Sequence, residues 1–415
     1  MHHFALRDGA LYAEEVPVSR IADEVGTPCY IYSVATLRRH ARVFKEPFPD
    51  GTVVAYSVKA LSNLSVLTLL QEQGLGADVV SGGELTRALR AGIDPQKIVF
   101  SGVGKTSEEL KAALEAGILQ FNVESEAELR MLSAVAEAVG KTAPVALRIN
   151  PDVDAETHPS ISTGKADDKF GIPWDRALES YALARDLPGI DPSGLDLHIG
   201  SQITSLDPFE RAAERAVGLV EELRAEGFAI SRLDLGGGLG VPYKDGEVPP
   251  LPSAYAERLT KVTAPLGVQL ILEPGRVIAG NAGILLTRIT LTKKQTTKSF
   301  AVVDAAMNDL IRPALYGAQH MILPGAEKDG QDETITIVGP VCESTDQFTA
   351  DASLRAPEAG DLLAFGTAGA YGAVQASQYN SRPLVPEVLV DGDQYKIIRR
   401  RPSYEEMLAL ETDLA

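Results

Sequence analysis

The chain has 415 residues, of which 45% are hydrophobic and 23% charged, a balance typical of globular proteins with a substantial core. This length predicts two domains. The formal net charge of −18 argues against nucleic acid and anionic membrane surfaces as partners.

Cysteine content and hydropathy narrow the class of protein further. Cys29 and Cys342 are the only cysteines, too few for a disulfide framework or a zinc cluster, so we expect a reducing, cytoplasmic location and no metal site. The first residues lack the apolar core of a signal peptide. No run of about 18 apolar residues predicts a membrane span.

Apolar strand-like runs alternate with helical segments between residues 50 and 275. The runs are 53–58, 76–80, 97–101, 119–123, 144–149, 194–199, 232–236 and 268–273. This alternation favours a (β/α)8 TIM barrel over an open sheet. Two long connections, 151–171 and 241–252, are either lids or partner-contact loops, or ordinary surface insertions.

Helix start and stop signals separate the strand-like runs. The expected N-terminal caps are Thr106 with Glu109, Ser125 with Glu128, and Asp207 before Pro208. The expected helix ends are Gly92, Gly117 and Gly140.

The pattern changes after residue 276. The next strand-like runs are 283–292, 299–304, 333–338, 361–366 and 385–390, and no helix is expected until 403–410. We therefore predict a second, β-rich domain. The predicted division is a barrel over 31–275 and a β-rich domain built from 1–30 and 276–415.

Polar and glycine residues follow the predicted barrel strands, where the catalytic groups of such barrels lie. They include Lys59, Asp78, His198, the run 236–238 and Glu273. A lysine in this position is a candidate Schiff-base nucleophile. The glycine run can approach a phosphate, the histidine can stack on a flat ring, and the glutamate can hold a ring nitrogen protonated.

Each of these residues also has a plainer interpretation. Lys59 and Glu273 could be solvated loop residues, His198 a buried core histidine, and the glycine run a flexible turn. Taken together, a Schiff-base lysine, a phosphate cradle, a stacking ring and a carboxylate predict a pyridoxal phosphate site.

Several motifs resemble one family. They are Tyr56-x-x-Lys59-Ala60, Asp78-Val-Val-Ser-Gly-Gly-Glu84, Asp152-Val-Asp-Ala, Thr157-His, Ile161-Ser-Thr-Gly164, Lys169-Phe-Gly-Ile172, His198-Ile-Gly-Ser-Gln202, Gly236-Gly-Gly238, Glu273-Pro-Gly-Arg276, Asn308-Asp-Leu-Ile-Arg312-Pro-Ala-Leu-Tyr316, Cys342-Glu-Ser344, Gly369-Ala-Tyr371-Gly and Tyr379-Asn-Ser-Arg-Pro383. The chain resembles the fold-type III pyridoxal phosphate-dependent decarboxylases, and among them most closely the diaminopimelate decarboxylases.

The resemblance implies an alanine racemase-like barrel with pyridoxal 5'-phosphate as cofactor. The implied reaction is decarboxylation of meso-2,6-diaminopimelate to L-lysine and CO2, the last step of lysine biosynthesis, in a homodimer with shared active sites. Arginine, ornithine and carboxynorspermidine decarboxylases of the same fold type remain alternatives. A catalytically inactive regulatory homologue and, from the barrel alone, a Schiff-base aldolase are also open.

The resemblance assigns roles to individual residues. Lys59 forms the Schiff base, His198 stacks on the ring and Cys342 donates a proton. The implied cofactor contacts are Lys59, Asp78, His198, Ser201, Gly237, Gly238, Glu273, Pro274, Gly275, Arg276 and Tyr371. The implied substrate contacts are Arg276, Arg312, Tyr316, Glu343 and Tyr371. Glu84 and Arg148 are expected to support Lys59 and the ring.

Overall fold

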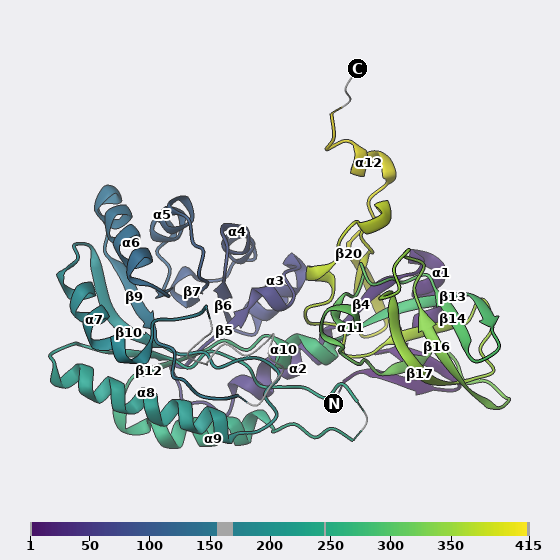
Figure 1. The fold of residues 1–415 in the computed structure, drawn as a ribbon, viewed down its shortest axis with the longest axis horizontal. Coiled ribbons are helices and arrows are strands. Elements are labelled where there is room, and N and C mark those ends of the chain that lie inside the picture. Colours follow the sequence, from purple (N-terminus) through teal and green to yellow (C-terminus); the bar gives the residue numbers. More distant parts are fainter. Residues whose placement is uncertain (1, 156–168, 245, 413–415) are drawn as a thin grey trace. The chain divides into compact units, whose positions relative to one another are not determined.

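The computed structural model describes residues 2–155, 169–244 and 246–412, and the chain divides into two compact units (Figure 1). The first unit comprises His40–Val241 and Val248–Ile278, and the second comprises Met1–Arg39, Pro242–Glu247 and Ala279–Ala415. Most of the connection predicted over 151–171 lies outside the described residues, together with the motif residues Thr157 to Gly164.

The first unit is a closed barrel of parallel strands in the order β10-β11-β12-β5-β6-β7-β8-β9 (Figure 1). The strands are β5 (Val53–Ser57), β6 (Gly76–Val79), β7 (Ile98–Phe100), β8 (Gln120–Val123), β9 (Ala143–Arg148), β10 (Ile190–Asp196), β11 (Arg232–Asp234) and β12 (Gln269–Leu272). Each apolar run expected from the sequence overlaps one of these strands, although β10 begins four residues before its run, so the predicted TIM barrel is confirmed. Val53, Ala55, Val99 and Ile271 form an apolar cluster among the strands.

Helices surround the barrel strands, as Figure 1 shows. They are α3 (Leu64–Glu72), α4 (Gly82–Arg90), α5 (Ser107–Ala116), α6 (Glu126–Val139), α7 (Ala177–Asp186), α8 (Asp207–Ala225) and α9 (Pro252–Thr263). The helices α2 (Val34–Lys45) and α10 (Arg276–Ala279) each span a boundary between the two units.

The predicted caps are correct to different degrees. Thr106 and Glu109 form a reciprocal capping box at the start of α5, as expected. Ser125 accepts the N–H of Glu128 at the start of α6, but the Glu128 carboxylate does not bond back to Ser125. It accepts instead from the Glu124 N–H at 3.0 Å and from Lys105 Nζ at 2.6 Å. The predicted capping box is incomplete because the Glu128 carboxylate binds the buried Lys105 and the Glu124 N–H instead of the Ser125 N–H.

Asp207 is not the N-terminal cap that the sequence predicted. It is the first residue of α8, and the cap position is taken by Leu206, whose side chain makes no cap hydrogen bond. The Asp207 carboxylate lies 3.3 Å from Arg258 Nη1 on α9. It therefore forms an ion pair with the arginine instead of a capping hydrogen bond. Two predicted helix ends are correct, since Gly117 and Gly140 end α5 and α6 with φ of 70° and 65°. The third helix, α4, ends at its cap Ala91, one residue before the predicted Gly92.

The second unit contains two sheets. One is three-stranded, β1-β2-β3, and the other has nine strands, with β18 pairing β13 and β15 beside the path β17-β16-β14-β13-β4-β19-β20. The strands are β1 (Phe4–Arg7), β2 (Ala10–Ala13), β3 (Val16–Pro17), β4 (Cys29–Ser33), β13 (Gly283–Lys294), β14 (Ser299–Val303), β15 (Ile322–Pro324), β16 (Asp332–Val338), β17 (Gln347–Arg355), β18 (Leu362–Phe365), β19 (Glu387–Asp391) and β20 (Gln394–Arg399). The predicted β-rich domain is confirmed.

The N-terminal segment belongs to this second unit because β4 pairs with β13 and with β19. Cys29, Ile31, Leu286 and Val388 accordingly share its buried core. The sequence had grouped residues 31–39 with the barrel, whereas the compact units group them with the β-rich part. The helix α1 (Val18–Val25) also lies here.

The expectation of no helix before residue 403 is wrong. The short helix α11 (Arg312–Tyr316) lies between β14 and β15. Pro313 in its first turn fixes a helical φ, and Gly317 ends it at a φ of 60°. Five residues are too few to show helical periodicity, so the pattern missed it. The final helix is shorter than predicted, α12 (Tyr404–Leu408), and carries the expected Ser403–Glu406 capping box.

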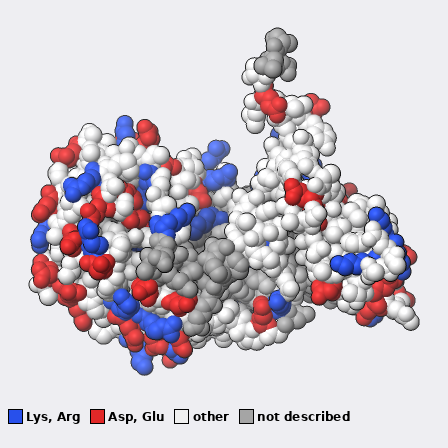
Figure 2. Space-filling model, viewed as in Figure 1, with Lys and Arg blue, Asp and Glu red and all other residues white. Residues whose placement is uncertain are grey.

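Acidic and basic side chains are interspersed over the face drawn in Figure 2. Within the described ranges, no helix combines the length and the apolar character needed to cross a bilayer.

Candidate active site

Lys59 lies directly after β5, in a single 3-10 turn (Val58–Ala60). Its Nζ is 2.5 Å from Oδ2 of Asp78, which is fully buried, while the lysine side chain is 35% exposed. The two residues approach because β5 pairs with β6 and places Ser57 opposite Asp78. Ser57 Oγ also donates to Asp78 Oδ2 at 2.8 Å. Burial acts to raise the pKa of Asp78, but the lysine and the hydroxyl donors outweigh it and hold the pKa low.

Glu84 and Arg148 are both anchored near strand ends. Glu84 Oε2 accepts the Val80 N–H at 2.9 Å, and burial raises the pKa of its carboxyl group to about 7. Arg148 Nη1 lies 2.9 Å from Glu124 Oε1. The Arg148 guanidinium therefore has a fixed orientation at the carboxyl end of β9.

The turn after β11 admits only glycine. A Cβ on Gly237 would lie 2.1 Å from the Glu273 carbonyl oxygen, and one on Gly238 would lie 2.4 Å from that of Gly200. Gly238 also has a φ of 111°, a region that other residues rarely adopt. The bare backbone of this turn can therefore approach a ligand phosphate with its N–H groups.

His198 follows β10 and faces the same turn. Its Nδ1 accepts the Gly237 N–H at 3.2 Å, which leaves the proton of the neutral ring on Nε2. Burial, followed by the positive charges of Arg148 and Lys59, lowers the pKa of His198 to about 3. The imidazole is therefore neutral at physiological pH and suited to stacking rather than to proton donation.

Glu273, at the end of β12, is buried among other carboxyl groups. Burial, followed by Asp234 and Asp78, raises its pKa well above the usual range. Carboxylate oxygens of Asp196, Asp234 and Glu273 lie within 4.8 Å of one another. A cationic ring nitrogen next to Glu273 would offset this accumulation of negative charge.

The sequence motifs did not single out the side chains that donate hydrogen bonds to Glu273. Ser101 Oγ and Asn122 Nδ2 each lie 3.1 Å from Glu273 Oε1. The sequence signal that could have indicated Asn122 lies in β8. Its polar residues Gln120 and Asn122 are two positions apart, so they share one face of a fully buried strand.

Ser201 and Arg276 come together although 75 residues separate them. Arg276 Nη2 donates to Ser201 Oγ at 2.9 Å, and the arginine is buried at the start of α10. Pro274, in the same turn, accepts the Ser57 N–H through its carbonyl at 3.0 Å. The Glu273–Arg276 turn is thus tied to β5 and to the loop after β10.

The remaining predicted residues belong to the β-rich unit. Arg312 is buried at the start of α11, where Nη1 lies 2.6 Å from the hydroxyl of Tyr243 and the guanidinium 4.5 Å from the centre of that ring. The sequence did not single out Tyr243. Tyr316, the last residue of α11, is half-buried.

Cys342 and Glu343 occupy an exposed turn after β16. The Cys342 N–H donates to Asn380 Oδ1 at 3.3 Å, and the Tyr379 hydroxyl donates to Glu343 Oε1 at 2.5 Å. The Asp346 carboxylate accepts two backbone N–H groups at 2.7 Å each, which closes the turn. Cys342 is a free, exposed thiol.

Tyr371 has a φ of 55°, in the left-handed region that costs free energy for a tyrosine. Its neighbour Gly372 allows no side chain, since a Cβ there would lie 2.6 Å from the Ala368 carbonyl oxygen. Such a strained, half-buried tyrosine is typical of a residue held for binding.

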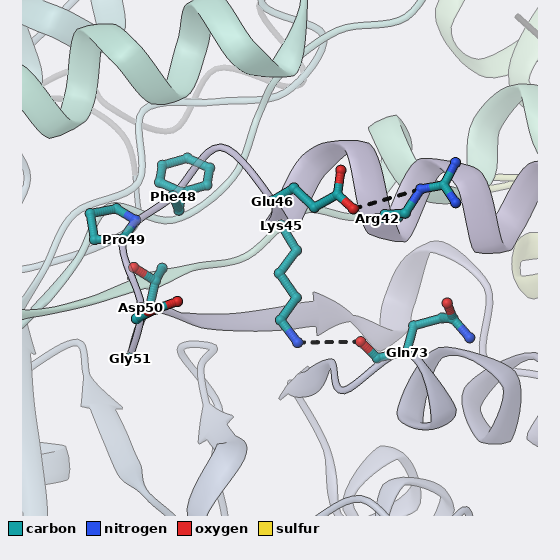
Figure 3. A pocket seen from close by; sticks show the side chains of 9 residues that line it. Arg42, Lys45, Glu46, Phe48, Pro49, Asp50, Gly51 and Gln73 are labelled. Atoms are coloured by element: carbon teal, nitrogen blue, oxygen red, sulfur yellow. Dashed lines mark hydrogen bonds and ion pairs between the residues drawn. The ribbon is translucent and has the colours of Figure 1, made fainter.

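A pocket of about 420 Å³ lies at the other end of β5 and is not the candidate site (Figure 3). It is lined by charged residues, including Arg42, Lys45 and Asp50, and Lys45 Nζ donates to the Gln73 carbonyl at 3.3 Å. The lining residues come before the amino-terminal ends of β5 and β6, whereas the candidate residues of the barrel follow the carboxyl ends of the strands.

The barrel residues fit pyridoxal phosphate. Lys59 offers an amine, the 236–238 turn offers backbone where any Cβ would collide, and the neutral His198 and buried Glu273 suit the face and nitrogen of a pyridine ring. A family model described as "Pyridoxal-dependent decarboxylase, pyridoxal binding domain" matches residues 34–280. The chain belongs to the pyridoxal-dependent decarboxylases, and its cofactor is pyridoxal phosphate.

Individual relatives narrow the assignment. The chain is 52% identical over 409 residues to the diaminopimelate decarboxylase of Vibrio cholerae, covering 98% of each. It is similar to the crystal structure of diaminopimelate decarboxylase from Helicobacter pylori complexed with L-lysine, with a TM-score of 0.91, 40% identity, and 95% and 98% of the chains covered. The enzyme from M. jannaschii in co-complex with L-lysine gives a TM-score of 0.95 at 36% identity, covering 100% and 99%. Within its class, this chain belongs to the diaminopimelate decarboxylase family.

Proposed function

We propose that this protein decarboxylates meso-2,6-diaminopimelate to L-lysine and CO2, the last step of lysine biosynthesis. The observation that carries the proposal is the Lys59 amine, held 2.5 Å from Asp78 at the carboxyl end of β5. It occurs in a chain that matches diaminopimelate decarboxylases over nearly its full length.

The bound cofactor withdraws the electrons that remain on the substrate when CO2 leaves. In this proposal Asp78 orients Lys59, and His198 presents the flat face of a neutral imidazole to the ring. Glu273 holds a proton at the ring nitrogen. The glycine turn and the Ser201–Arg276 pair bind the phosphate and keep the ring from rotating.

The substrate needs both cationic and anionic partners because its distal end carries a carboxylate and an ammonium group. Arg276 and Arg312 are the proposed carboxylate partners, since a guanidinium can bind a carboxylate through two parallel hydrogen bonds. Glu343 is the proposed ammonium partner, and Tyr316 and Tyr371 add hydroxyl contacts. A site for ornithine would need an acidic partner for its distal amine but no arginine pair.

Cys342 is the proposed proton donor to the substrate carbon. Its thiol is free and exposed in the single chain, and the turn that carries it is fixed by Asp346. These features suit a group that completes the active site of a second copy, so we propose a homodimer with shared sites. A donor thiol must stay reduced, which agrees with a cytoplasmic location.

The deciding experiment measures L-lysine and CO2 released from meso-diaminopimelate, with and without added pyridoxal phosphate. Ornithine, arginine and carboxynorspermidine serve as competing substrates. We expect cofactor-dependent lysine formation and little turnover of the other three. Preferential turnover of any of the three would replace the proposed substrate, and a protein that binds the cofactor without any turnover would be a binding protein instead.

A further inference from the structure

A line of polar side chains runs inside the barrel from the half-buried Arg232 of β11 to the buried Glu273. Arg232 Nε donates to Gln120 Oε1 at 2.9 Å, and Gln120 Nε2 donates to Asn122 Oδ1 at 2.8 Å. Asn122 Nδ2 in turn donates to Glu273 Oε1 at 3.1 Å. Gln120 and Asn122 are both fully buried, two positions apart on β8, so they share one face of the strand.

The direction of this line is set by Arg232. A guanidinium can only donate hydrogen bonds, whereas an amide side chain can present either its oxygen or its nitrogen. If Gln120 were reversed, its NH2 group would face the guanidinium and both groups would lose a partner. Gln120 must therefore offer its N–H to Asn122, so the Asn122 NH2 group points away from Gln120. Its Nδ2 lies 3.1 Å from Glu273 Oε1 and 3.2 Å from both Asp234 Oδ2 and Ser101 Oγ, so Glu273 is the nearest of three acceptors.

Residues of β10 leave space for Gln120 and bind Arg232. A Cβ on Gly194 of β10 would lie 2.5 Å from Gln120 Oε1, the atom that accepts from Arg232. Arg232 Nη2 also donates to Ser193 Oγ at 2.8 Å, and Ser193 Oγ donates to Asp191 Oδ2 at 2.7 Å. The arginine is thus held at the start of β11 by contacts on both sides.

We propose that Arg232, Gln120 and Asn122 form a relay that keeps an N–H donor on Oε1 of Glu273 and so favours the ionised carboxylate opposite the cofactor's ring nitrogen. The three are positioning residues, since they act through Glu273. This inference rests on the proposed pairing of Glu273 with that nitrogen.

The surroundings of Glu273 explain why such a donor matters. The charged groups that act on it are Asp78, Asp196, Asp234, Lys59 and Arg148. Burial and the neighbouring aspartates favour a proton on Glu273, whereas a donor to Oε1 favours the carboxylate. Ser101 supplies one such donor and Asn122 the other. Without the Asn122 donor, the proton shared with the ring nitrogen moves toward Glu273, and the ring withdraws electrons less strongly.

The test uses pyridoxal phosphate labelled with 15N in its ring, bound to the full-length protein. The 15N chemical shift reports directly whether the ring nitrogen carries a proton, which a merely structural role would not change. In Asn122→Leu and Arg232→Met we expect the ring nitrogen to lose its proton about one pH unit lower than in wild type, with kcat about tenfold lower. Arg232→Lys keeps an obligate donor and should retain the wild-type shift.

Two further variants separate the possible failures. Arg224→Met removes a guanidinium that donates only to backbone carbonyls near the same end of the barrel, at 2.7 to 3.2 Å, and should leave the ring shift unchanged. Glu273→Gln should abolish the ring protonation. If Glu273→Gln has no effect on the shift, the Glu273 assignment and the relay both fall. If it has an effect but folded Asn122→Leu and Arg232→Met match wild type, the relay alone is overturned.

Discussion

Glu84 shows how a single half-buried carboxyl group makes the stability of the barrel unit depend on pH. Its pKa rises from 4.5 to about 7 because burial penalises the charged form. Between these two values the folded protein binds a proton that the unfolded chain has released. The free energy of unfolding therefore falls as the pH rises from 4.5 to 7, and the loss is complete above that range.

Replacing this carboxyl group should remove the pH dependence that it causes. Glu84→Gln keeps an oxygen to accept the Val80 N–H but cannot ionise. We expect a rise in Tm of roughly 6–12 °C at pH 8 and little change at pH 4. A pKa shift from 4.5 to about 7 costs about 3 kcal/mol at high pH, and each kcal/mol moves Tm by roughly 2–4 °C in a domain of this size. Calorimetry across this pH range provides the measurement. An equal change in Tm at both pH values would contradict the assignment.

Arg312 carries the proposed choice of substrate at the residue scale. Arg312→Ala should raise KM for meso-diaminopimelate about tenfold to a hundredfold, the loss expected for hydrogen bonds to a charged group, with a smaller effect on kcat. Arg355→Ala is the matched control, since Arg355 forms an exposed pair with Asp332 at 3.0 Å in the same unit. An unchanged KM in Arg312→Ala would remove this residue from the substrate site.

The glycine turn after β11 is the element that we propose binds the cofactor phosphate. Gly237→Ala would place a methyl group 2.1 Å from the Glu273 carbonyl, so the turn or the end of β12 must move. We expect the Kd for pyridoxal phosphate to rise about tenfold or more, as measured by cofactor titration. Gly218→Ala in α8 meets no atom within 4 Å and should bind the cofactor like wild type. Equal affinity in the two variants would exclude the turn from the phosphate site.

Sequence patterns predicted such elements well where the signal was local. The barrel strands were recognised from short apolar runs, and the α5 capping box from residues three apart. The Asp207 cap failed because Arg258, on another helix, recruits the carboxylate. The helix α11 was missed because one turn of helix shows no period.

The chain as a whole folds into two units, each built from segments that are not contiguous in sequence. The barrel unit carries Lys59, His198 and Glu273, whereas the β-rich unit carries Arg312, Cys342, Glu343 and Tyr371. A proposed homodimer would combine residues from both kinds of unit.

Shared sites predict complementation between inactive variants. Lys59→Ala and Cys342→Ala should each lack activity, but mixed dimers would contain one intact site. After subunit exchange in equal amounts, we expect about a quarter of wild-type activity, because half of the dimers are mixed and each has one working site of two. Native mass spectrometry confirms the exchange. If exchange is complete and no activity returns, each chain completes its own site.

The sequence by itself determined the barrel, the β-rich domain, the family and the identity of the cofactor. These follow from local periodicity and from motifs that place lysine, glycine and carboxylate residues after successive strands. Only the tertiary structure decided which neighbouring side chains fix the charge and the orientation of the motif residues. Arg232 reaches Gln120 across 112 positions, and Tyr243 supports Arg312 across 69. Such partners meet because the strands close into a barrel and the chain returns to each unit, and no local pattern encodes that proximity.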